Sequence, residues 1–307
     1  MKIIFYCEGT QAEPWLQGLS GALPGADVSV WQPGAPQADY AVVWAPPQQL
    51  VDEQQPGLKA LLNIGAGVDA LLRLRLPPFL SVVRLQDAGM AVQMAEYVCQ
   101  AVIRQFRELG ACEADMRQGQ WVQRKPLRRS SFVVGVLGLG VLGARVAQAL
   151  AQFEFPVVGW SRSPKALDGV RCFDGADGLN DFLAASRVLV NLLPLTPDTE
   201  NILNHGTLSR LPGGAYVINV ARGAHLVDED LLALLDSGHL SGATLDVFRT
   251  EPLPQGHPFR QHPKITLTPH ISARTLRDET IAQIAGKIAA LQRGEAVAGR
   301  VELGRGY

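Results

Sequence analysis

The stretch that decides the fold runs from residue 132 to residue 150 and reads F-V-V-G-V-L-G-L-G-V-L-G-A-R-V-A-Q-A-L. Its first six residues are apolar and predict a buried strand, and residues 144–150 continue as a helix. Between them stand Gly138, Gly140 and Gly143, in the G-x-G-x-x-G spacing of a dinucleotide-binding turn. These glycines would permit the turn, let the backbone approach a pyrophosphate, and let helix and strand pack closely. A glycine-rich turn without a ligand is the weaker alternative, because the next strand of such a fold also follows.

That next strand indicates which dinucleotide is bound. Residues 156–163 read P-V-V-G-W-S-R-S, and the position where NAD-binding units carry an acid is occupied by Ser161. Arg162 and Ser163 follow it, so no carboxylate repels a 2'-phosphate and a guanidinium can fork onto one. We therefore predict NADPH (NADP+) in preference to NADH. The alternative is a surface arginine in a loop, with NAD bound weakly.

The rest of the chain alternates apolar runs with helical stretches, which is typical of open parallel sheets. The 307 residues suggest two domains. Strands are predicted at residues 3–6, 28–31, 41–44, 58–64, 132–137, 188–193, 215–220, 243–247 and 265–267. Helices are predicted at residues 14–23, 94–118, 228–239 and about 275–293, the last returning to pack on the first domain. The fold class is α/β, with two Rossmann-like domains built on parallel sheets.

Composition narrows the possible functions. The chain is 47% hydrophobic and 19% charged with a net charge of -1, so neither nucleic acid nor an anionic membrane is favoured as a partner. Its four cysteines stand far apart, as free thiols do in a reducing compartment. The chain start has no signal-peptide pattern and no apolar run reaches the length of a membrane span, which predicts a cytoplasmic protein. No histidine has a metal-like spacing, so no metal is implied.

Two sets of residues that follow predicted strands are candidates for ligand binding or catalysis. The amides of Gly65, Ala66 and Gly67 could hold a small anion, although a turn that needs glycine only for its backbone is an equal alternative. Further along, Arg222, Glu251 and His270 each follow a strand, at the sheet edge where a cofactor would lie. Taken singly, Arg222 could be a structural ion-pair partner, and His270 could bind a backbone carbonyl.

Taken in order, these motifs resemble those of the D-isomer-specific 2-hydroxyacid dehydrogenases. The resemblance covers essentially the whole chain. It is carried by G65-A-G-V-D69, the fingerprint at 138–143, N191-L-L-P-L-T-P-D-T199, N219-V-A-R-G223, L245-D-V-F-R-T-E-P-L253 and T268-P-H270. It implies a flavodoxin-like, substrate-binding (catalytic) domain of residues 1–97 and 282–307, and an NAD(P)-binding Rossmann domain of residues 98–281.

The resemblance also implies the roles of the catalytic residues in hydride transfer to a 2-oxo acid. His270 would be the general acid, Glu251 would pair with its imidazole, and Arg222 would hold the substrate carboxylate and polarise the carbonyl. Gly65, Ala66 and Gly67 would hold the carboxylate from the other domain.

Other positions would bind the cofactor or limit the substrate. Asp246 would contact the nicotinamide carboxamide, Thr199 would lie near the ribose-phosphate, and Trp44 would wall the substrate pocket. The remaining cofactor-binding positions are Leu139, Val141, Leu142, Leu193, Pro194, Val220 and Ala221.

A closer resemblance, carried by W160-S-R-S163, G89-M-A-V-Q-M-A-E-Y97 and the R305-G-Y end, is to bacterial members of this family that reduce glyoxylate to glycolate and hydroxypyruvate to D-glycerate. Two alternatives stay open: a reductase of a bulkier 2-oxo acid, and a non-catalytic NADP-sensing protein with the dehydrogenase fold. The complete set of Arg222, Glu251 and His270 argues against a sensor, which needs no proton donor. The family also implies a homodimer formed through the segment near residues 88–118.

Overall fold

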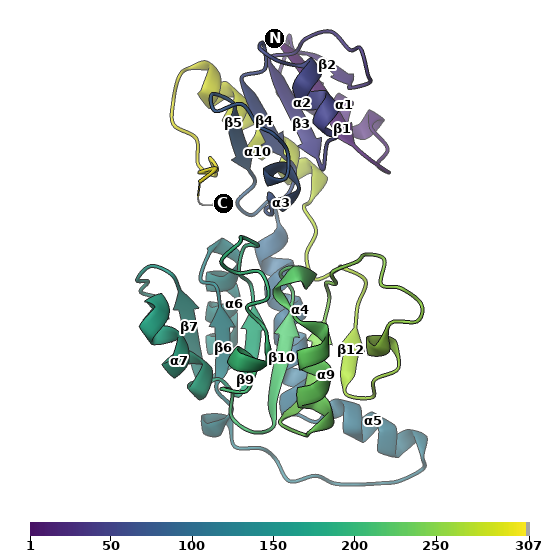
Figure 1. Cartoon of the computed structure of the whole chain (residues 1–307), viewed down its shortest axis with the longest axis vertical. Helices are drawn as coiled ribbons and strands as arrows, with labels where there is room; N and C mark the ends of the chain where they lie inside the picture. Colours follow the sequence, from purple (N-terminus) through teal and green to yellow (C-terminus); the bar gives the residue numbers. More distant parts are fainter. Residues whose placement is uncertain (305–307) are drawn as a thin grey trace. The chain divides into compact units, whose positions relative to one another are not determined.

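The computed structural model describes residues 1–304 and separates into two compact units (Figure 1). Unit 1 comprises Met1–Met90 and the segment from Thr275 onward, and unit 2 comprises Ala91–Arg274. The predicted boundaries, after residue 97 and before residue 282, fall inside helices α4 (Met90–Phe106) and α10 (Arg277–Gln292). The chain passes between the units near the starts of these helices, a point that apolar periodicity within a helix does not reveal. The functional roles of the two domains stay predictions.

Unit 1 is an α/β layer structure around one parallel sheet. Its five strands lie in the order β2-β1-β3-β4-β5, and every neighbouring pair is parallel. This is the flavodoxin-like order. The strands are β1 (Lys2–Cys7), β2 (Asp27–Val30), β3 (Tyr40–Trp44), β4 (Ala60–Asn63) and β5 (Ser81–Arg84).

Helices cover both faces of this sheet. One core cluster joins the sheet to α1 (Glu13–Ala22) and α10, and a second joins it to α2 (Gln48–Glu53) and α3 (Asp69–Leu72). The last helix thus packs in the first unit, as predicted from the apolar face with Ile281, Ile284 and Ile288. A Cβ on Gly18 of α1 would lie 2.4 Å from Ile281 Cδ1, so a glycine lets the two helices approach closely.

Unit 2 holds a seven-stranded parallel sheet in the order β12-β11-β10-β9-β6-β7-β8. The strand order reverses between β6 and β9, which is the switch point where ligands of doubly wound folds bind. Its strands are β6 (Val134–Leu137), β7 (Val157–Ser161), β8 (Val170–Asp174), β9 (Val188–Asn191), β10 (Ala215–Asn219), β11 (Leu240–Leu245) and β12 (Ile265–Leu267). The two parallel sheets confirm the predicted α/β class.

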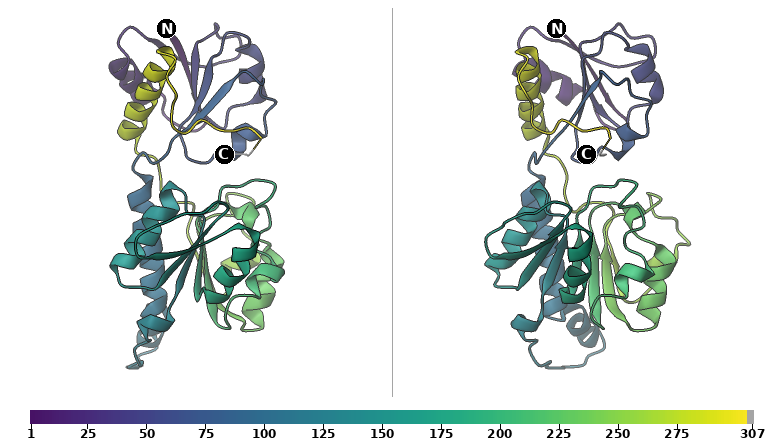
Figure 2. Two further views of the ribbon diagram at one scale, coloured as in Figure 1. Left: turned by 90° about the vertical axis from the view of Figure 1, so that its left-hand side faces the viewer. Right: turned by 60° about the vertical axis from the view of Figure 1, so that its left-hand side comes forward.

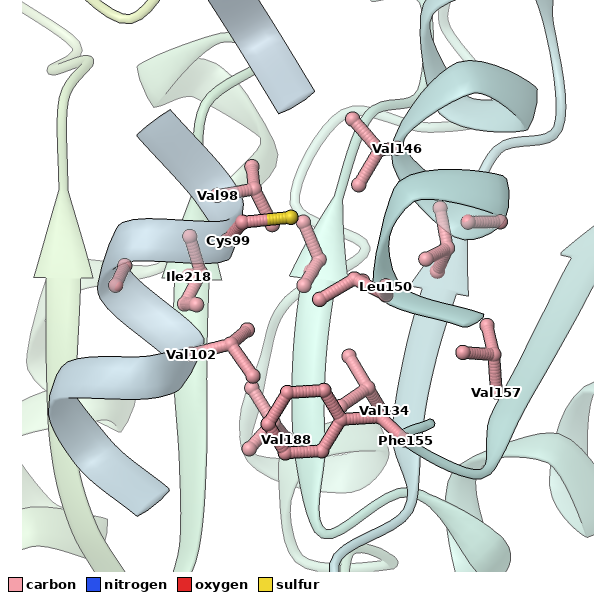
Figure 3. Close-up of a cluster of buried hydrophobic side chains, with 14 of the residues drawn as sticks. Val98, Cys99, Val102, Val134, Val146, Leu150, Phe155, Val157, Val188 and Ile218 are labelled. Carbon is pink, nitrogen blue, oxygen red and sulfur yellow. The ribbon is translucent and has the colours of Figure 1, made fainter. Parts of the chain in front are cut away.

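The helices of unit 2 lie on both faces of its sheet (Figure 2). On one face α4 and α6 (Val141–Gln152) cover the cluster drawn in Figure 3, where Val98, Cys99 and Val102 of α4 meet Leu150 of α6 and the strands. On the other face α7 (Gly175–Ala185) and α9 (Asp228–Asp236) cover the second cluster. The shorter elements are α5 (Leu109–Arg117), α8 (His205–Leu208), η1 (Arg129–Ser131), η2 (Gly223–His225) and η3 (Pro258–Arg260).

The prediction of one helix over residues 94–118 is wrong, because this segment forms two helices. Helix α4 ends at Phe106, and α5 begins at Leu109 after Glu108, whose φ of 50° lies in the left-handed region. A continuous helix cannot contain such a residue. None of the side chains of α5 is buried, so no core contact holds it in line with α4.

Two further findings bear on the sequence-based expectations. All four cysteines are free thiols. Within residues 1–304, no helix is long and apolar enough to cross a membrane.

Candidate active site

The glycine-rich turn joins β6 to α6 as its spacing predicts. Gly138 has a φ of 107°, in the left-handed region, and a Cβ there would lie 2.8 Å from the carbonyl oxygen of Leu192. A Cβ on Gly143 would lie 1.8 Å from the carbonyl oxygen of Gly138, so only glycine allows the helix to pack on this turn. Both positions therefore require glycine for steric reasons.

Gly140 differs, because a Cβ there would meet nothing within 4 Å. The residue is exposed and forms the N-cap of α6, a position at which helix amides lack intrahelical partners. An open space beside a helix N-terminus fits a phosphate group. Val141 and Leu142 open the helix at this point, whereas the side chain of Leu139 is buried, so only its backbone can contribute to binding.

The end of β7 places the residues expected to bind a 2'-phosphate. Ser161 is buried and its hydroxyl donates to the carbonyl oxygen of Ser163 at 2.8 Å, which closes the turn after the strand. Arg162 and Ser163 are exposed. The serine at the position of the usual acid thus shapes the turn that presents Arg162.

Buried asparagines tie together the loops after β9 and β10. Asn191 donates to Asn219 Oδ1 at 3.0 Å and accepts from the Leu193 amide at 3.2 Å. Asn219 in turn donates to the Arg222 carbonyl oxygen at 3.0 Å. Both asparagines are fully buried, so these contacts fix the start of the Arg222 loop. The sequence showed both residues inside motifs but gave no sign of this pairing.

Hydrogen bonds between its own residues stabilise the loop after β9. The Thr199 hydroxyl donates to the Pro194 carbonyl oxygen at 2.7 Å and accepts from the Thr196 amide at 2.9 Å. The side chains of Leu193, Val220 and Ala221 are buried, so these positions can offer a ligand only their backbone. Pro194, by contrast, is exposed.

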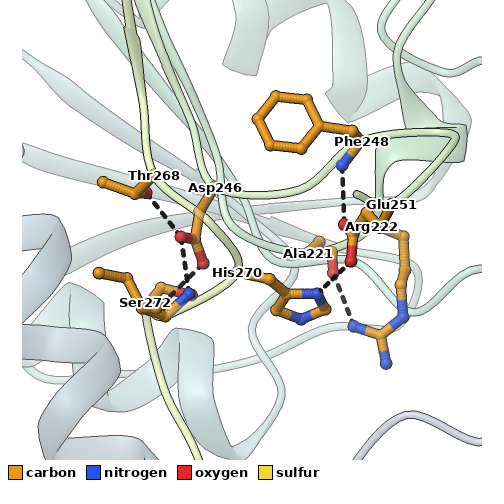
Figure 4. Close-up of polar contacts among 9 residues, drawn as sticks. Ala221, Arg222, Asp246, Phe248, Glu251, Thr268, His270 and Ser272 are labelled. Carbon is orange, nitrogen blue, oxygen red and sulfur yellow. Dashed lines mark hydrogen bonds and ion pairs between the residues drawn. The ribbon is translucent and has the colours of Figure 1, made fainter. Parts of the chain in front are cut away.

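Arg222, Glu251 and His270 come together at the carboxyl ends of β10, β11 and β12 (Figure 4). His270 Nδ1 lies 2.7 Å from Glu251 Oε2, and the other carboxylate oxygen accepts from the Phe248 amide at 2.9 Å. With Nδ1 bound to the carboxylate, Nε2 is the imidazole nitrogen that remains for a substrate. Arg222 donates to the Ala221 carbonyl oxygen at 2.7 Å, with its guanidinium beside Glu251.

The charge of Glu251 follows from these contacts. Burial raises the pKa of Glu251, but the hydrogen bonds from His270 and the Phe248 amide, together with the nearby Arg222 guanidinium, outweigh burial and hold the pKa below its ordinary value. The carboxylate is therefore ionised at neutral pH and places a negative charge beside the His270 ring.

Close backbone contact brings the Arg222 and Glu251 loops together. A Cβ on Gly223 would lie 1.9 Å from the carbonyl carbon of Phe248, so the two loops touch at a point where only glycine fits. Arg249 adds a second link, because its guanidinium donates to the Leu226 carbonyl oxygen at 2.7 Å and to that of Ala224 at 3.3 Å. Sequence reasoning missed Arg249, since its partners in the Arg222 loop are backbone carbonyls without a residue signature.

Asp246 lies under the loop that carries His270. The side chain is 0% exposed, and its oxygens accept from the Thr268 hydroxyl at 2.6 Å and from the Ile271 and Ser272 amides at 2.8 Å each. The predicted contact of Asp246 with the nicotinamide carboxamide stays a prediction. Asp246 binds the loop that carries His270.

In unit 1 the Gly65–Gly67 loop follows β4. Buried Asn63 donates to the carbonyl oxygens of Gly65 and Gly67, at 2.9 and 2.8 Å. A Cβ on Gly65 would lie 2.2 Å from Cζ3 of Trp44, so the indole of Trp44 lies against the glycine backbone. Gly65 is therefore required by a neighbouring side chain rather than by its own φ, and the loop and Trp44 form one surface.

Comparisons with known proteins show the family of the chain. Residues 99–272 match the family model of the D-isomer specific 2-hydroxyacid dehydrogenase, NAD binding domain. Glyoxylate/hydroxypyruvate reductase A of Serratia proteamaculans (strain 568) is 48% identical over the full length of both chains, and its counterpart in Yersinia enterocolitica is 45% identical.

Solved structures agree as well. A D-isomer specific 2-hydroxyacid dehydrogenase from Xanthobacter autotrophicus Py2, in complex with NADPH and MES, is 40% identical with a TM-score of 0.95 over 100% of this chain and 99% of that one. The NADPH-dependent glyoxylate/hydroxypyruvate reductase of Sinorhizobium meliloti, in complex with NADP and sulfate, is 34% identical with a TM-score of 0.93 over the same shares. The chain belongs to the D-isomer specific 2-hydroxyacid dehydrogenase family.

Proposed function

We propose that the protein reduces glyoxylate to glycolate and hydroxypyruvate to D-glycerate with NADPH. The observation that carries the proposal is the group of Arg222, Glu251 and His270, in which Glu251 lies 2.7 Å from Nδ1 of His270. An acid, its charge partner and a cation at one sheet edge are what reduction of a 2-oxo acid requires. The names of the full-length relatives support the choice of substrate.

The three residues divide the work of the reaction. When bound, NADPH supplies a hydride to the keto carbon of the substrate. His270 gives a proton from Nε2 to the carbonyl oxygen as negative charge grows there, and Glu251 stabilises the protonated imidazole from the other side. Arg222 binds the substrate carboxylate and polarises the carbonyl.

Cofactor choice rests on two features of unit 2. The turn at Gly138, Gly140 and Gly143, with the N-terminus of α6, would hold the pyrophosphate. Arg162, at the exposed end of the turn closed by Ser161, would bind the 2'-phosphate as a charged fork. Relatives solved with NADPH or NADP support this preference.

Substrate size would be limited by unit 1. The amides of Gly65, Ala66 and Gly67 would bind the carboxylate, because Asn63 holds the carbonyls of Gly65 and Gly67. Trp44 lies against Gly65, and its bulk would favour the small side chains of glyoxylate and hydroxypyruvate.

We also propose a homodimer in the cytoplasm. Apolar side chains are exposed on α5 and in the loop after it, among them Leu109, Met116 and Trp121, the last 80% exposed. Such a group marks an interaction surface, and a second copy of the chain is the partner that the family implies. Light scattering that gives the mass of a monomer would contradict the dimer. Unpaired cysteines suit a reducing compartment.

The proposed function is tested by NADPH oxidation with a panel of 2-oxo acids, from glyoxylate and hydroxypyruvate to phenylpyruvate. We expect the highest kcat/KM for the two small acids, and a lower value for each when NADH replaces NADPH. A higher kcat/KM for the bulky acid would contradict the role of Trp44. NADPH binding without oxidation by any acid would contradict the enzyme and favour a cofactor sensor.

A further inference from the structure

His270 stands in an unusual backbone conformation. Its φ is 53°, in the left-handed region that side chains with a Cβ rarely adopt. A residue is kept in such a conformation only when its surroundings determine it. The loop from Thr268 to Arg274 must therefore be held from outside.

A chain of hydrogen bonds holds the first half of this loop. The Thr268 hydroxyl donates to Asp246 Oδ1 at 2.6 Å, so its oxygen is left to accept from a second donor. The Tyr97 hydroxyl lies 2.5 Å from the same Thr268 oxygen, so Tyr97 is the donor in that contact. Tyr97 thus donates to Thr268, and Thr268 donates to Asp246. The Asp246 carboxylate also accepts from the amides of Ile271 and Ser272, on the far side of His270.

A second side chain of the same helix holds the end of the loop. Gln93 donates from Nε2 to the Arg274 carbonyl oxygen at 2.8 Å, and its Oε1 accepts from the Arg274 amide at 3.3 Å. Gln93 and Tyr97 are four residues apart on α4 and lie on one face of it. The loop is therefore tied to α4 on both sides of His270.

Helix α4 is a rigid support for these contacts. Val98 and Val102 are fully buried against the sheet of unit 2. Burial raises the pKa of Tyr97 to about 12, although its hydrogen bond with Thr268 lowers it. The hydroxyl therefore keeps its proton, and with it the donor role, over the working pH range.

We propose that Tyr97 and Gln93 are positioning residues, which hold His270 in its left-handed conformation with Nε2 aimed at the substrate. Tyr97 acts through Thr268 and Asp246, and Gln93 acts through the backbone of Arg274. The inference rests on the proposed role of His270 as the general acid. Unit 2 begins at Ala91 and ends at Arg274, so the contact of Gln93 with Arg274 joins the two ends of this unit's chain to within two residues.

The test compares steady-state kinetics of hydroxyl-deletion variants with glyoxylate and NADPH. Tyr97→Phe and Thr268→Val should each lower kcat about tenfold, since a 1 Å misplacement costs about 100-fold and one lost tie permits a smaller shift. The KM for NADPH should stay within about twofold, because the phosphate contacts lie elsewhere. Thr268→Ser keeps the hydroxyl and should restore kcat.

Tyr216→Phe is the matched control. Tyr216 is also a tyrosine of unit 2, and its hydroxyl lies 2.8 Å from that of Thr244, a residue outside the 268–274 loop. It should keep the wild-type kcat. An equal fall of kcat in Tyr216→Phe would assign the effect to general destabilisation and overturn the inference.

The His270→Ala background separates this inference from the proposed function. If His270→Ala keeps full activity, the proposed function fails. If His270→Ala is impaired and Tyr97→Phe and Thr268→Val keep the wild-type kcat, the positioning role alone is refuted. If Tyr97→Phe still lowers the residual rate of His270→Ala by its full factor, Tyr97 does not act through His270, and that also refutes it. We expect no further loss in the double variant.

Discussion

Gly223 lies where the Arg222 loop and the Glu251 loop are in close backbone contact. Gly223 follows Arg222, and a Cβ there would lie 1.9 Å from the carbonyl carbon of Phe248 and 2.3 Å from the Arg249 nitrogen. Carbon atoms in contact are ordinarily about 3.5 Å apart, so Gly223→Ala must separate the two backbones by about 1.5 Å. No rotamer change can relieve the clash, because the atoms met are backbone atoms.

The separation would act on catalysis more than on folding. The Phe248 amide orients Glu251, and Arg222 is next in sequence to the substituted residue, so the shift should change the positions of Arg222 and Glu251 relative to each other. A displacement of this size should lower kcat/KM for glyoxylate about 100-fold. Overpacking should cost about 1–3 kcal/mol of unfolding free energy. NADPH affinity should change little, since the glycine turn at 138–143 is not involved.

The assay combines steady-state kinetics, calorimetric NADPH binding and thermal unfolding. The control is Gly213→Ala in the same unit, where a Cβ would meet nothing within 4 Å. This variant should match the wild type in all three measurements. A Gly223→Ala protein with kcat/KM within twofold of the wild type would show that contact between the two loops is not needed, and the reasoning would be refuted.

Three further predictions concern the cofactor, the substrate and pH. Arg162→Ala should weaken NADPH binding by about 1.5–3 kcal/mol and leave NADH nearly unchanged in calorimetry; equal losses would exclude a 2'-phosphate contact. Gly65→Ala would place a Cβ 2.2 Å from Trp44, so KM for glyoxylate should rise while NADPH affinity stays constant; an unchanged KM would contradict a role for this loop. The folded-state pKa of Glu251 is lowered, so its ionised form stabilises the protein above its ordinary pKa of about 4.3 and this stabilisation is lost as pH falls through the folded value. Between pH 6 and pH 3 the unfolding temperature of Glu251→Gln should therefore fall less than that of the wild type. An equal fall in both proteins would contradict a stabilising role of the ionised carboxylate.

The parts of the fold visible in the sequence are those in which burial is continuous. Strands such as Val134–Leu137 and Val188–Asn191 are buried at every residue, and their sequences are apolar except for Asn191 at the end of the second. The edge strand Val170–Asp174 is only partly buried and contains Arg171, so it gave no such signal and was not predicted. The break at Glu108 was missed because a left-handed residue leaves no mark in apolar periodicity.

The candidate site was also predictable only in part. Arg222, Glu251 and His270 were predictable because the carboxyl ends of parallel strands meet at one sheet edge, which narrows the possible positions of polar residues. Contacts made through backbone atoms, such as those of Gln93 with Arg274, depend on the path of the loops. Asp246 lies inside a matching motif, yet its burial under the His270 loop became visible only in three dimensions.

The central claim is that His270 delivers the proton during reduction. The most direct measurement is kcat for glyoxylate reduction by His270→Ala, with NADPH binding measured on the same protein. We predict a fall in kcat of about 10²–10⁴-fold, the range for losing a general acid, with unchanged NADPH affinity. A wild-type kcat in His270→Ala would contradict the account.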